Sequence, residues 1–482
     1  MGQNRMSQKP TLVAVQSDTS AKPQRVLGVR EAVALVIGIV IGAGIFKAPA
    51  MVAGLTGSPA WMFGVWVLGG MISLIGALCY AELATAYSHT GGDYHFLQRA
   101  YGRPLAFLFG WARFSVITTG SIALLAFVFG DYMAQLLPLP GLIPDAPLYA
   151  AAAILGLSWI NLRGTRLGTA TQFWLTALEV GGLLLIVGAA FFIDASPVPP
   201  IVPVPTATLD AGSLGLAMVF VLITYGGWNE AAYISAELKD VQRSMVKALI
   251  CAITIITALY LLVTWAYWKG LGMAGMAVSE ALAADLLEVA FGATGGKIIS
   301  AVVALAALTS INATMIVGAR TNYAIGQDWP ALAALGIWDG ARGTPVNALR
   351  VQCLAALLLV AVGTWLGSGF KSMVEFTAPV FWLFFLLSGI SLFVLRIREP
   401  DTERPFKVPL FPLLPLLFCI TCACMLWASL SYVYSQSLGG LNAAWIGVAV
   451  LAAGVFVLLF VLRHQARFSG ANVRPISLRR RP

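Results

Sequence analysis

The sequence predicts an all-α polytopic membrane protein with twelve transmembrane helices, arranged as two five-helix halves and two further helices. Of its 482 residues, 59% are hydrophobic and only 11% are charged, and the mean hydropathy is +0.84. The apolar residues form twelve runs of about 18 to 25 residues, the length that crosses ~30 Å of hydrocarbon. Glycines interrupt the first and the sixth run, which hold corresponding positions in the two halves. Soluble globular proteins do not have this composition.

The twelve expected spans are, in order, 31–56, 60–87, 104–137, 147–162, 170–193, 214–236, 247–270, 297–324, 350–367, 372–396, 410–433 and 442–463. The third and eighth are long, and we expect them to tilt or to extend past the bilayer. The polar segment 1–25 has no apolar region or cleavage site of a signal peptide, so we expect a disordered cytoplasmic tail. A membrane domain is expected over 26–466, divided into a first repeat (26–193), a second repeat (214–396) and peripheral helices (410–463), and a basic cytoplasmic tail over 467–482.

The net charge of +9 is explained by membrane topology and does not indicate a nucleic-acid partner. Lysines and arginines precede the first run, follow the last, and occupy every second loop between the runs. The alternate loops 131–146, 194–213 and 434–441 contain neither residue. By the positive-inside rule we expect both termini on the cytoplasmic side of a cell membrane, inner or plasma, that the chain crosses many times.

We expect no metal and no cofactor. All six cysteines lie inside apolar runs, and no histidine or carboxylate in the run accompanies the pattern Cys419-x-x-Cys422-x-Cys424, so helix packing is the better interpretation. His89 and His95 share a glycine-containing loop, which is a weak metal pattern. Because no cysteine lies in an outward loop, no disulfide-linked partner subunit is expected.

The first run contains Gly38, Gly42 and Gly44 within residues 33–49. Glycine in a helix costs about 1 kcal/mol relative to alanine, so this helix can open around Ala43. An opened helix at membrane depth is tolerated only where it lines a cavity or meets a ligand. The alternative is a helix made narrow for close packing.

The sixth run, around residues 219–233, is interrupted in the same way. Gly226 and Gly227 break it, and the polar Asn229 and Glu230 follow. Two broken helices at corresponding positions of two halves are the best sequence indication of the substrate site of an inverted-repeat transporter. The pair therefore favours a binding site at the first break over close packing.

Two carboxylates lie in or near apolar sequence. Glu179 is well inside the fifth run, and a lone carboxylate there must be protonated, paired with a cation, or hydrated. It is a candidate for proton coupling, and the alternative is a neutral acid that bonds a neighbouring helix. Glu82, near the end of the second run, is either functional or a structural partner of an arginine. The polar residues of 309–314 either face the interior or bond between helices.

Four motifs resemble the amino acid–polyamine–organocation permeases, most closely their L-type amino acid branch. They are Ile41-Gly-Ala-Gly-Ile-Phe46, Tyr225-Gly-Gly-Trp-Asn229, Gly318-Ala-Arg320 with Tyr323, and Glu403-Arg-Pro-Phe-Lys-Val-Pro409. In order and spacing they cover roughly residues 26–466. The resemblance implies a leucine-transporter-type fold, with a 5+5 inverted-repeat core, discontinuous helices 1 and 6, and two peripheral helices.

The resemblance also implies how an amino acid binds. Its carboxylate is expected at the N–H groups of Ala43, Gly44 and Ile45, at the positive end of a half-helix. Its ammonium is expected at the carbonyls of Val40 or Ile41 and of Ile223. The expected side-chain pocket comprises Ile223, Trp228, Asn229, Phe381 and Trp382. The complete expected substrate site is Val40, Ile41, Gly42, Ala43, Gly44, Ile45, Ile223, Tyr225, Gly226, Gly227, Trp228, Asn229, Phe381 and Trp382, with Glu179 and Glu230 as coupling residues.

Three positions depart from the family pattern. Ala43 stands where many relatives have serine, and Ile223 where many have an aromatic lid. Glu179 falls where sodium-independent relatives place a lysine near the first break, and a glutamate does not replace a built-in cation.

The expected function is a permease for L-amino acids, with neutral side chains, that works by alternating access as a sodium-independent proton symporter or exchanger. The alternative is a permease for cationic amino acids or polyamines, with Glu179 or Glu230 as counter-ion. An enzyme is disfavoured because the apolar runs hold no nucleophile–base or metal constellation. A channel is disfavoured because no ring of like charges or filter sequence is present.

Overall fold

The structure is a computed structural model of the whole chain. It describes residues 28–42, 44–89, 91–139, 145–193, 211–279, 282–366, 369–435, 437–438 and 441–471. The expected N-terminal tail 1–25 and Ala43 lie outside the described residues, as do positions 194–210 of the proline-rich loop and positions 472–482 of the C-terminal tail.

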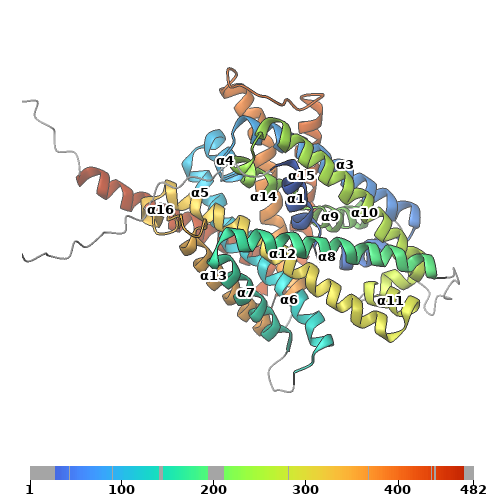
Figure 1. Cartoon of the computed structure of the whole chain (residues 1–482). Helices are drawn as coiled ribbons and strands as arrows, with labels where there is room; N and C mark the ends of the chain where they lie inside the picture. Colours follow the sequence, from blue (N-terminus) through green and yellow to red (C-terminus); the bar gives the residue numbers. More distant parts are fainter. Residues whose placement is uncertain are drawn as a thin grey trace, which may run out of the picture.

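Helices make up most of the described chain, and most described residues of the twelve expected spans lie in helices, with more than one helix in the first, third and sixth spans (Figure 1). In chain order the elements are α1 (Val29–Val40), α2 (Gly44–Thr56), α3 (Pro59–Ala86), α4 (Asp93–Tyr101), α5 (Arg103–Ala112), the π-helical turn η1 (Arg113–Thr118), α6 (Thr119–Leu136), α7 (Asp145–Arg163), α8 (Thr165–Phe192), α9 (Ala211–Thr224), the 3₁₀ segment η2 (Trp228–Glu237), α10 (Val241–Val278), α11 (Leu282–Phe291), α12 (Ala293–Asp328), the 3₁₀ turn η3 (Pro330–Leu332), α13 (Val346–Leu366), α14 (Gly369–Arg398), α15 (Leu413–Ser435), β1 (Ser437–Leu438), β2 (Leu441–Asn442) and α16 (Ala443–Ala471). The two strands form a short antiparallel hairpin between α15 and α16.

Many of these helices are long and apolar enough to cross a membrane. Within the described residues eight stretches qualify by length and composition: Pro59–Ala86, Arg103–Ala134, Gly212–Ala232, Arg243–Val278, Thr294–Asp328, Val346–Thr364, Thr377–Arg398 and Leu413–Ser431. The bent pair α1 and α2 makes a ninth when it is counted as one span, and α8 and α16 contain shorter apolar stretches. The protein is therefore a multi-pass helical membrane protein, and the number of twelve spans stays a prediction.

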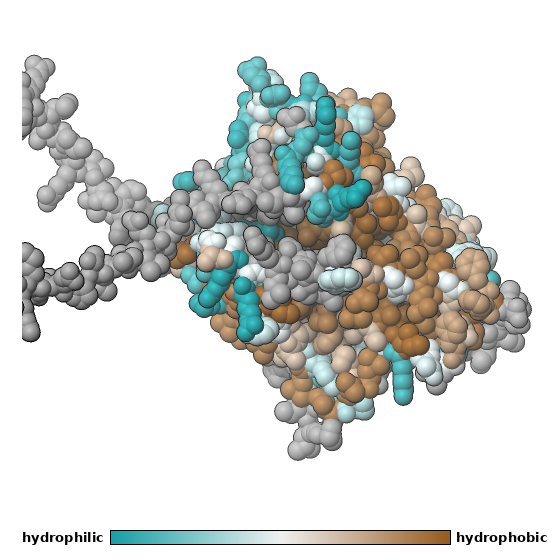
Figure 2. Space-filling model, viewed as in Figure 1, coloured by the Kyte–Doolittle hydropathy of each residue, from teal (hydrophilic) through white to brown (hydrophobic). Residues whose placement is uncertain are grey.

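The outer surface agrees with a lipid environment. Large apolar side chains stand exposed on several helices, among them Phe192 (77%), Trp427 (72%) and Phe456 (72%). Figure 2 shows apolar side chains over the central and right-hand parts of the visible face, with hydrophilic residues gathered at the top and at the left of the view. Exposed apolar area of this extent indicates contact with a membrane rather than with water.

The two broken spans pack against each other in the middle of the bundle. Helix α2 contacts α9, and α1 contacts η2, so the first half of each broken span lies beside the second half of the other. Helix α1 also contacts α8, α10 and α12. The neighbouring helices thus enclose both breaks and position the site described below.

Glu82, at the end of α3, is a structural partner of arginines. Its carboxylate is 2% exposed and accepts hydrogen bonds from Arg396 Nε (2.7 Å) and Nη2 (2.6 Å). The backbone N–H of Val408 donates to the same carboxylate at 2.7 Å, and Arg404 Nε lies 3.6 Å from it. Of the two interpretations of Glu82, the structure therefore supports pairing, and this pairing ties α3 to the end of α14 and the loop that follows.

Candidate functional site

The first break lies between α1 and α2, whose axes differ by 50°. Helix α1 ends at Val40, and its last carbonyls no longer bond within the helix. The Tyr260 hydroxyl on α10 donates to Val40 O at 3.0 Å, and the Ser310 hydroxyl on α12 donates to Ile41 O at 3.2 Å. The break predicted from the glycines is therefore present, and hydroxyl groups lie within hydrogen-bonding distance of two carbonyls beside it.

The second break separates α9 from η2. Helix α9 ends at Thr224, and the N–H of Gly226 donates to Ile223 O at 3.0 Å in a tight turn. Gly227 has φ +110°, a conformation that favours glycine. The Tyr260 hydroxyl also lies 3.2 Å from Thr224 O, so one hydroxyl contacts the carbonyl ends of both broken spans.

Glycines allow the two breaks to touch. A Cβ atom added at Gly44 meets Thr224 Oγ1 at 3.1 Å, and one added at Gly227 meets Ile39 Cγ2 at 2.9 Å. Both distances are shorter than ordinary van der Waals contact between heavy atoms. Larger side chains at these two positions would push the breaks apart.

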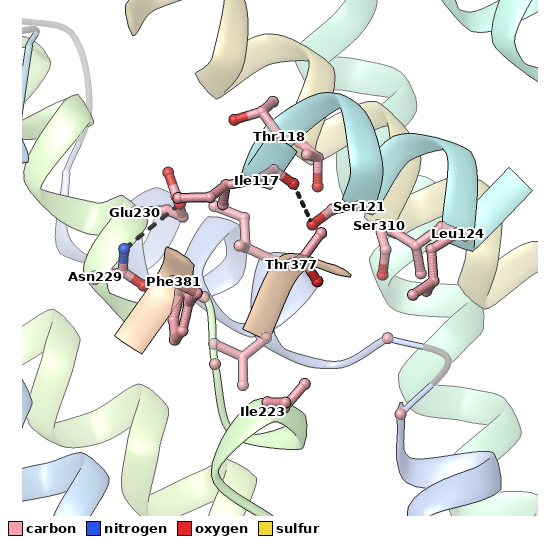
Figure 3. A pocket seen from close by; sticks show the side chains of 18 of the residues that line it. Ile117, Thr118, Ser121, Leu124, Ile223, Asn229, Glu230, Ser310, Thr377 and Phe381 are labelled. Atoms are coloured by element: carbon pink, nitrogen blue, oxygen red, sulfur yellow. Dashed lines mark hydrogen bonds between the residues drawn. The ribbon is translucent and has the colours of Figure 1, made fainter. Parts of the chain in front are cut away.

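A cavity of about 230 Å³ lies between the two breaks (Figure 3). Three further segments complete its wall: η1 with the start of α6, the middle of α12, and α14. Its lining residues are Ile39, Val40, Gly42, Gly44, Arg113, Ile117, Thr118, Ser121, Leu124, Leu125, Ile223, Thr224, Gly226, Gly227, Asn229, Glu230, Ser310, Thr314, Val317, Thr377, Ala378 and Phe381.

Most of the expected site residues line this cavity. They are Val40, Gly42, Gly44, Ile223, Gly226, Gly227, Asn229, Glu230 and Phe381. Others are buried in the bundle and do not line it: Ile41, Ile45, Tyr225, Trp228, Trp382 and Glu179. Ala43 lies outside the described residues.

Trp228 and Trp382 belong to an aromatic cluster behind the cavity wall. Their ring centroids lie 5.3 Å and 6.0 Å from that of Phe385. Phe381, which lines the cavity, stacks on Phe385 at 4.6 Å. Of the three aromatic side chains expected in the pocket, the structure places one on the cavity and two in the layer that supports it.

An ion pair forms part of the cavity wall. Arg113, the first residue of η1, bonds Glu230 Oε2 through Nη2 and donates from Nε to Thr321 Oγ1 on α12 at 3.1 Å. The Arg113 side chain is 5% exposed and the Glu230 side chain 17%. The sequence reasoning did not select Arg113, although a charged residue inside the apolar run 104–137 was a usable signal.

Asn229 adds a polar group beside this pair. Its Nδ2 lies 3.5 Å from Glu230 Oε1, the outer limit of a hydrogen bond (Figure 3). Its Oδ1 is buried without a hydrogen-bond partner among the described residues. An orphaned buried acceptor is unusual and suits a ligand that brings N–H groups.

The polar residues of 309–314 divide between the two interpretations. Ser310 and Thr314 line the cavity. Asn312 instead accepts a hydrogen bond from Asn161 Nδ2 at 2.7 Å, which ties α12 to α7. Both an interior-facing role and helix packing are therefore present in this segment.

Glu179 lies behind the first break. It belongs to α8, which packs against α1 and α12, and its side chain is fully buried. Neither carboxyl oxygen has a hydrogen-bond partner among the described residues.

The two histidines of the α3–α4 connection stack on each other. Their ring centroids are 4.3 Å apart, and the Gly91 N–H donates to His89 Nδ1 at 2.9 Å. Burial, together with the neighbouring His89 and Arg99, lowers the pKa of His95 to about 4. Within the part of the chain that the structure describes, no three His, Cys, Asp or Glu side chains gather as a metal site.

Sequence comparisons identify relatives of this chain. A family model described as "Amino acid permease" matches residues 27–458. The b(0,+)-type amino acid transporter 1 of Homo sapiens is 30% identical over 405 residues, covering 82% of this chain and 81% of the relative, and that of Mus musculus is 29% identical over 404 residues, with the same coverage. The large neutral amino acids transporter small subunit 2 of Oryctolagus cuniculus is 30% identical over 408 residues, covering 81% and 74%. By name, these relatives are all transporters.

Proposed function

Because the chain belongs to the amino acid permease family and is a transporter rather than an enzyme, we propose that it carries L-amino acids with neutral side chains by alternating access. The observation that carries the proposal is the cavity enclosed by the two helix breaks. The similarity of the chain to a large neutral amino acids transporter supports the neutral substrate class.

The half-helix ends suit the charged head of an amino acid. The N-terminus of α2 at Gly44 carries the positive end of a helix dipole and binds the substrate carboxylate. The C-terminal ends of α1 and α9 present carbonyls at Val40 and Thr224, which bind the ammonium group. Thr224 O replaces the expected Ile223 O, which already accepts a hydrogen bond from the Gly226 N–H. Each carbonyl oxygen has two lone pairs, so a bond from Tyr260 still leaves room for a substrate N–H.

The proposed architecture is a 5+5 inverted repeat with two peripheral helices. The packing of α2 on α9 and of α1 on η2 supports it, since an inverted pair of broken helices brings opposite halves together. In this scheme residues 26–193 and 214–396 form the two repeats, 410–463 the peripheral helices, and both termini are cytoplasmic.

Cationic substrates are the less favoured alternative. The two carboxylates that were candidate counter-ions are poorly suited to hold a substrate cation, because the charge of Glu230 is balanced by Arg113 and Glu179 does not line the cavity. Uptake competition tests this directly. Liposomes that contain the purified protein take up labelled leucine, and the uptake is measured in the presence of unlabelled leucine, alanine, arginine or putrescine. Stronger competition by arginine or putrescine than by leucine contradicts the neutral substrate class.

We assign proton coupling to Glu179, without a role for sodium. The carboxyl group is fully buried and has no partner among the described residues, and the neutral acid is the form that such surroundings tolerate. Glu179→Gln keeps the shape and removes the titrating group. In sodium-free liposomes with an inward proton gradient, we expect the variant to lose gradient-driven accumulation and to keep exchange. Glu399→Gln, on an exposed pair, is the control. Equal accumulation by wild type and Glu179→Gln refutes the assignment.

The chain is proposed to work without a disulfide-linked subunit in a cell membrane. All six cysteines are free thiols within the helices α3, α10, α13 and α15. The purified chain alone is therefore expected to transport, and to migrate identically on reducing and non-reducing gels. Transport that appears only after a second subunit is added contradicts this point.

A further inference from the structure

The cavity wall carries one charge of each sign. Among the described residues that line the cavity, Arg113 and Glu230 are the charged ones, and they are bonded to each other. The formal charge of this wall is therefore zero. The remaining lining residues are apolar, backbone glycines, or neutral hydroxyl and amide groups.

The two partners are held differently. Arg113 is fixed from α12 by the bond of its Nε to Thr321 Oγ1 and is nearly inaccessible. Glu230 is the more exposed partner, and its Oε1 has only the long contact with Asn229. Asn229 Oδ1 has no partner at all among the described residues. Both partners line the cavity, and their opposite charges lie side by side on its wall.

We propose that the Arg113–Glu230 pair selects substrates by side-chain charge, so that the cavity accepts neutral side chains and rejects both cations and anions. This inference rests on the proposed function, since it concerns the side chain of a transported amino acid. A neutral side chain leaves the pair intact. A charged side chain must either compete for one partner or remain without a balancing counter-charge in a largely buried place.

The physical basis is the cost of an unpaired buried charge. Removing one member of a buried ion pair is strongly unfavourable because the remaining charge has lost its solvation without gaining a partner. Because the pair is neutral as a unit, a lysine or glutamate side chain beside it brings into the cavity a charge that the wall does not balance. The uncharged hydrogen-bonding groups of Asn229 and Ser121 impose no such penalty on polar substrates.

The test is a reversal of preference. Arg113→Gln leaves Glu230 as an unpaired anion and is expected to raise the affinity for lysine relative to leucine by about tenfold or more. Glu230→Gln leaves Arg113 as an unpaired cation and is expected to raise the affinity for glutamate relative to leucine by a similar factor. The double variant has no unpaired charge and is expected to keep the preference for leucine. Arg99→Gln, which breaks an exposed pair outside the cavity, is the matched control.

Ligand-induced thermal stabilisation and liposome uptake are measured for leucine, lysine and glutamate with each purified variant. If one single variant does not fold, the other and the double variant still give the result. The inference is overturned if the lysine-to-leucine and glutamate-to-leucine affinity ratios of the folded single variants lie within twofold of those of wild type. It is also overturned if the double variant has the same affinity ratios as one of the single variants. Wild type that binds no leucine refutes the proposed substrate class, and the variants' relative affinities for lysine and glutamate then test the charge effect separately.

Discussion

Replacing Glu82 by glutamine measures what the buried arginine cluster contributes to stability. The glutamine has the same size, but it carries no charge and turns one of two acceptor oxygens into an N–H donor. That donor then faces the Arg396 guanidinium or the Val408 N–H, which are donors as well. Two charge-assisted hydrogen bonds from Arg396 become weaker, and at least one group loses its partner.

The expected magnitude follows from the burial of the groups. Breaking a buried ion pair by removing one member costs about 3–5 kcal/mol. The Glu82 side chain is 2% exposed but that of Arg396 is 20% exposed, so water recovers part of the loss and the lower end of this range applies. We expect a loss of about 3 kcal/mol, or a fall of about 6 °C in apparent Tm at roughly 2 °C per kcal/mol.

The assay is a thermal scan of purified protein in one detergent at one scan rate, because membrane proteins often unfold irreversibly. Glu399→Gln makes the same chemical change in the Arg99–Glu399 pair, whose side chains are 41% and 26% exposed. An exposed pair contributes less than about 1 kcal/mol, so this control is expected to shift Tm by 2 °C or less. Equal shifts for the two variants, or no shift for Glu82→Gln, refute the reasoning.

Two further predictions concern the second break and the stacked histidines. Gly227→Ala places a Cβ 2.9 Å from Ile39 Cγ2 at φ +110°, so we expect a loss of about 1–3 kcal/mol in stability together with weaker leucine binding. The pKa of His95 is lowered to about 4 by burial, against about 6.5 in the unfolded chain. The unfolded chain therefore binds more protons between these values, and stability falls as the pH is lowered from about 6.5 towards 4, by about 2 kcal/mol at pH 5. His95→Asn is expected to flatten this fall in a series of thermal scans.

Each of these two predictions has its own control. Gly181 on α8 has nothing within 4 Å of an added Cβ, so Gly181→Ala is expected to leave binding unchanged and stability unchanged or slightly raised. If Gly227→Ala behaves like Gly181→Ala, the close contact between the breaks is not required. A pH profile of His95→Asn that is as steep as that of wild type shows that other groups cause the acid sensitivity.

The sequence located both helix breaks to within a few residues. Glycines in otherwise apolar runs are a local signal, and the chain opens where they occur, between Val40 and Gly44 and between Thr224 and Trp228. The helical conformation of the spans was also predictable from the sequence, because the thickness of the bilayer sets the length of an apolar run that crosses it. Helices α4 and α11 were not predicted, since each is short and lies between the expected spans.

The direction of individual side chains was not predictable from the same pattern. Trp228 follows the turn at Gly226 and Gly227 and begins a 3₁₀ segment, so a regular helical period does not give its direction. Arg113 begins a π-helical turn, which shifts the residues around it relative to an α-helix. Both irregularities change which groups reach the cavity.

Tyr260 has a single hydroxyl proton, yet its oxygen lies 3.0 Å from Val40 O and 3.2 Å from Thr224 O. One proton makes one strong bond at a time, so one of the two carbonyls is always left with only a weak partner. An arriving ammonium group therefore finds a vacant acceptor whichever way the phenol points. When the ammonium group binds one carbonyl, the Tyr260 hydroxyl donates its proton to the other. The empty and loaded proteins therefore differ in the orientation of this hydroxyl.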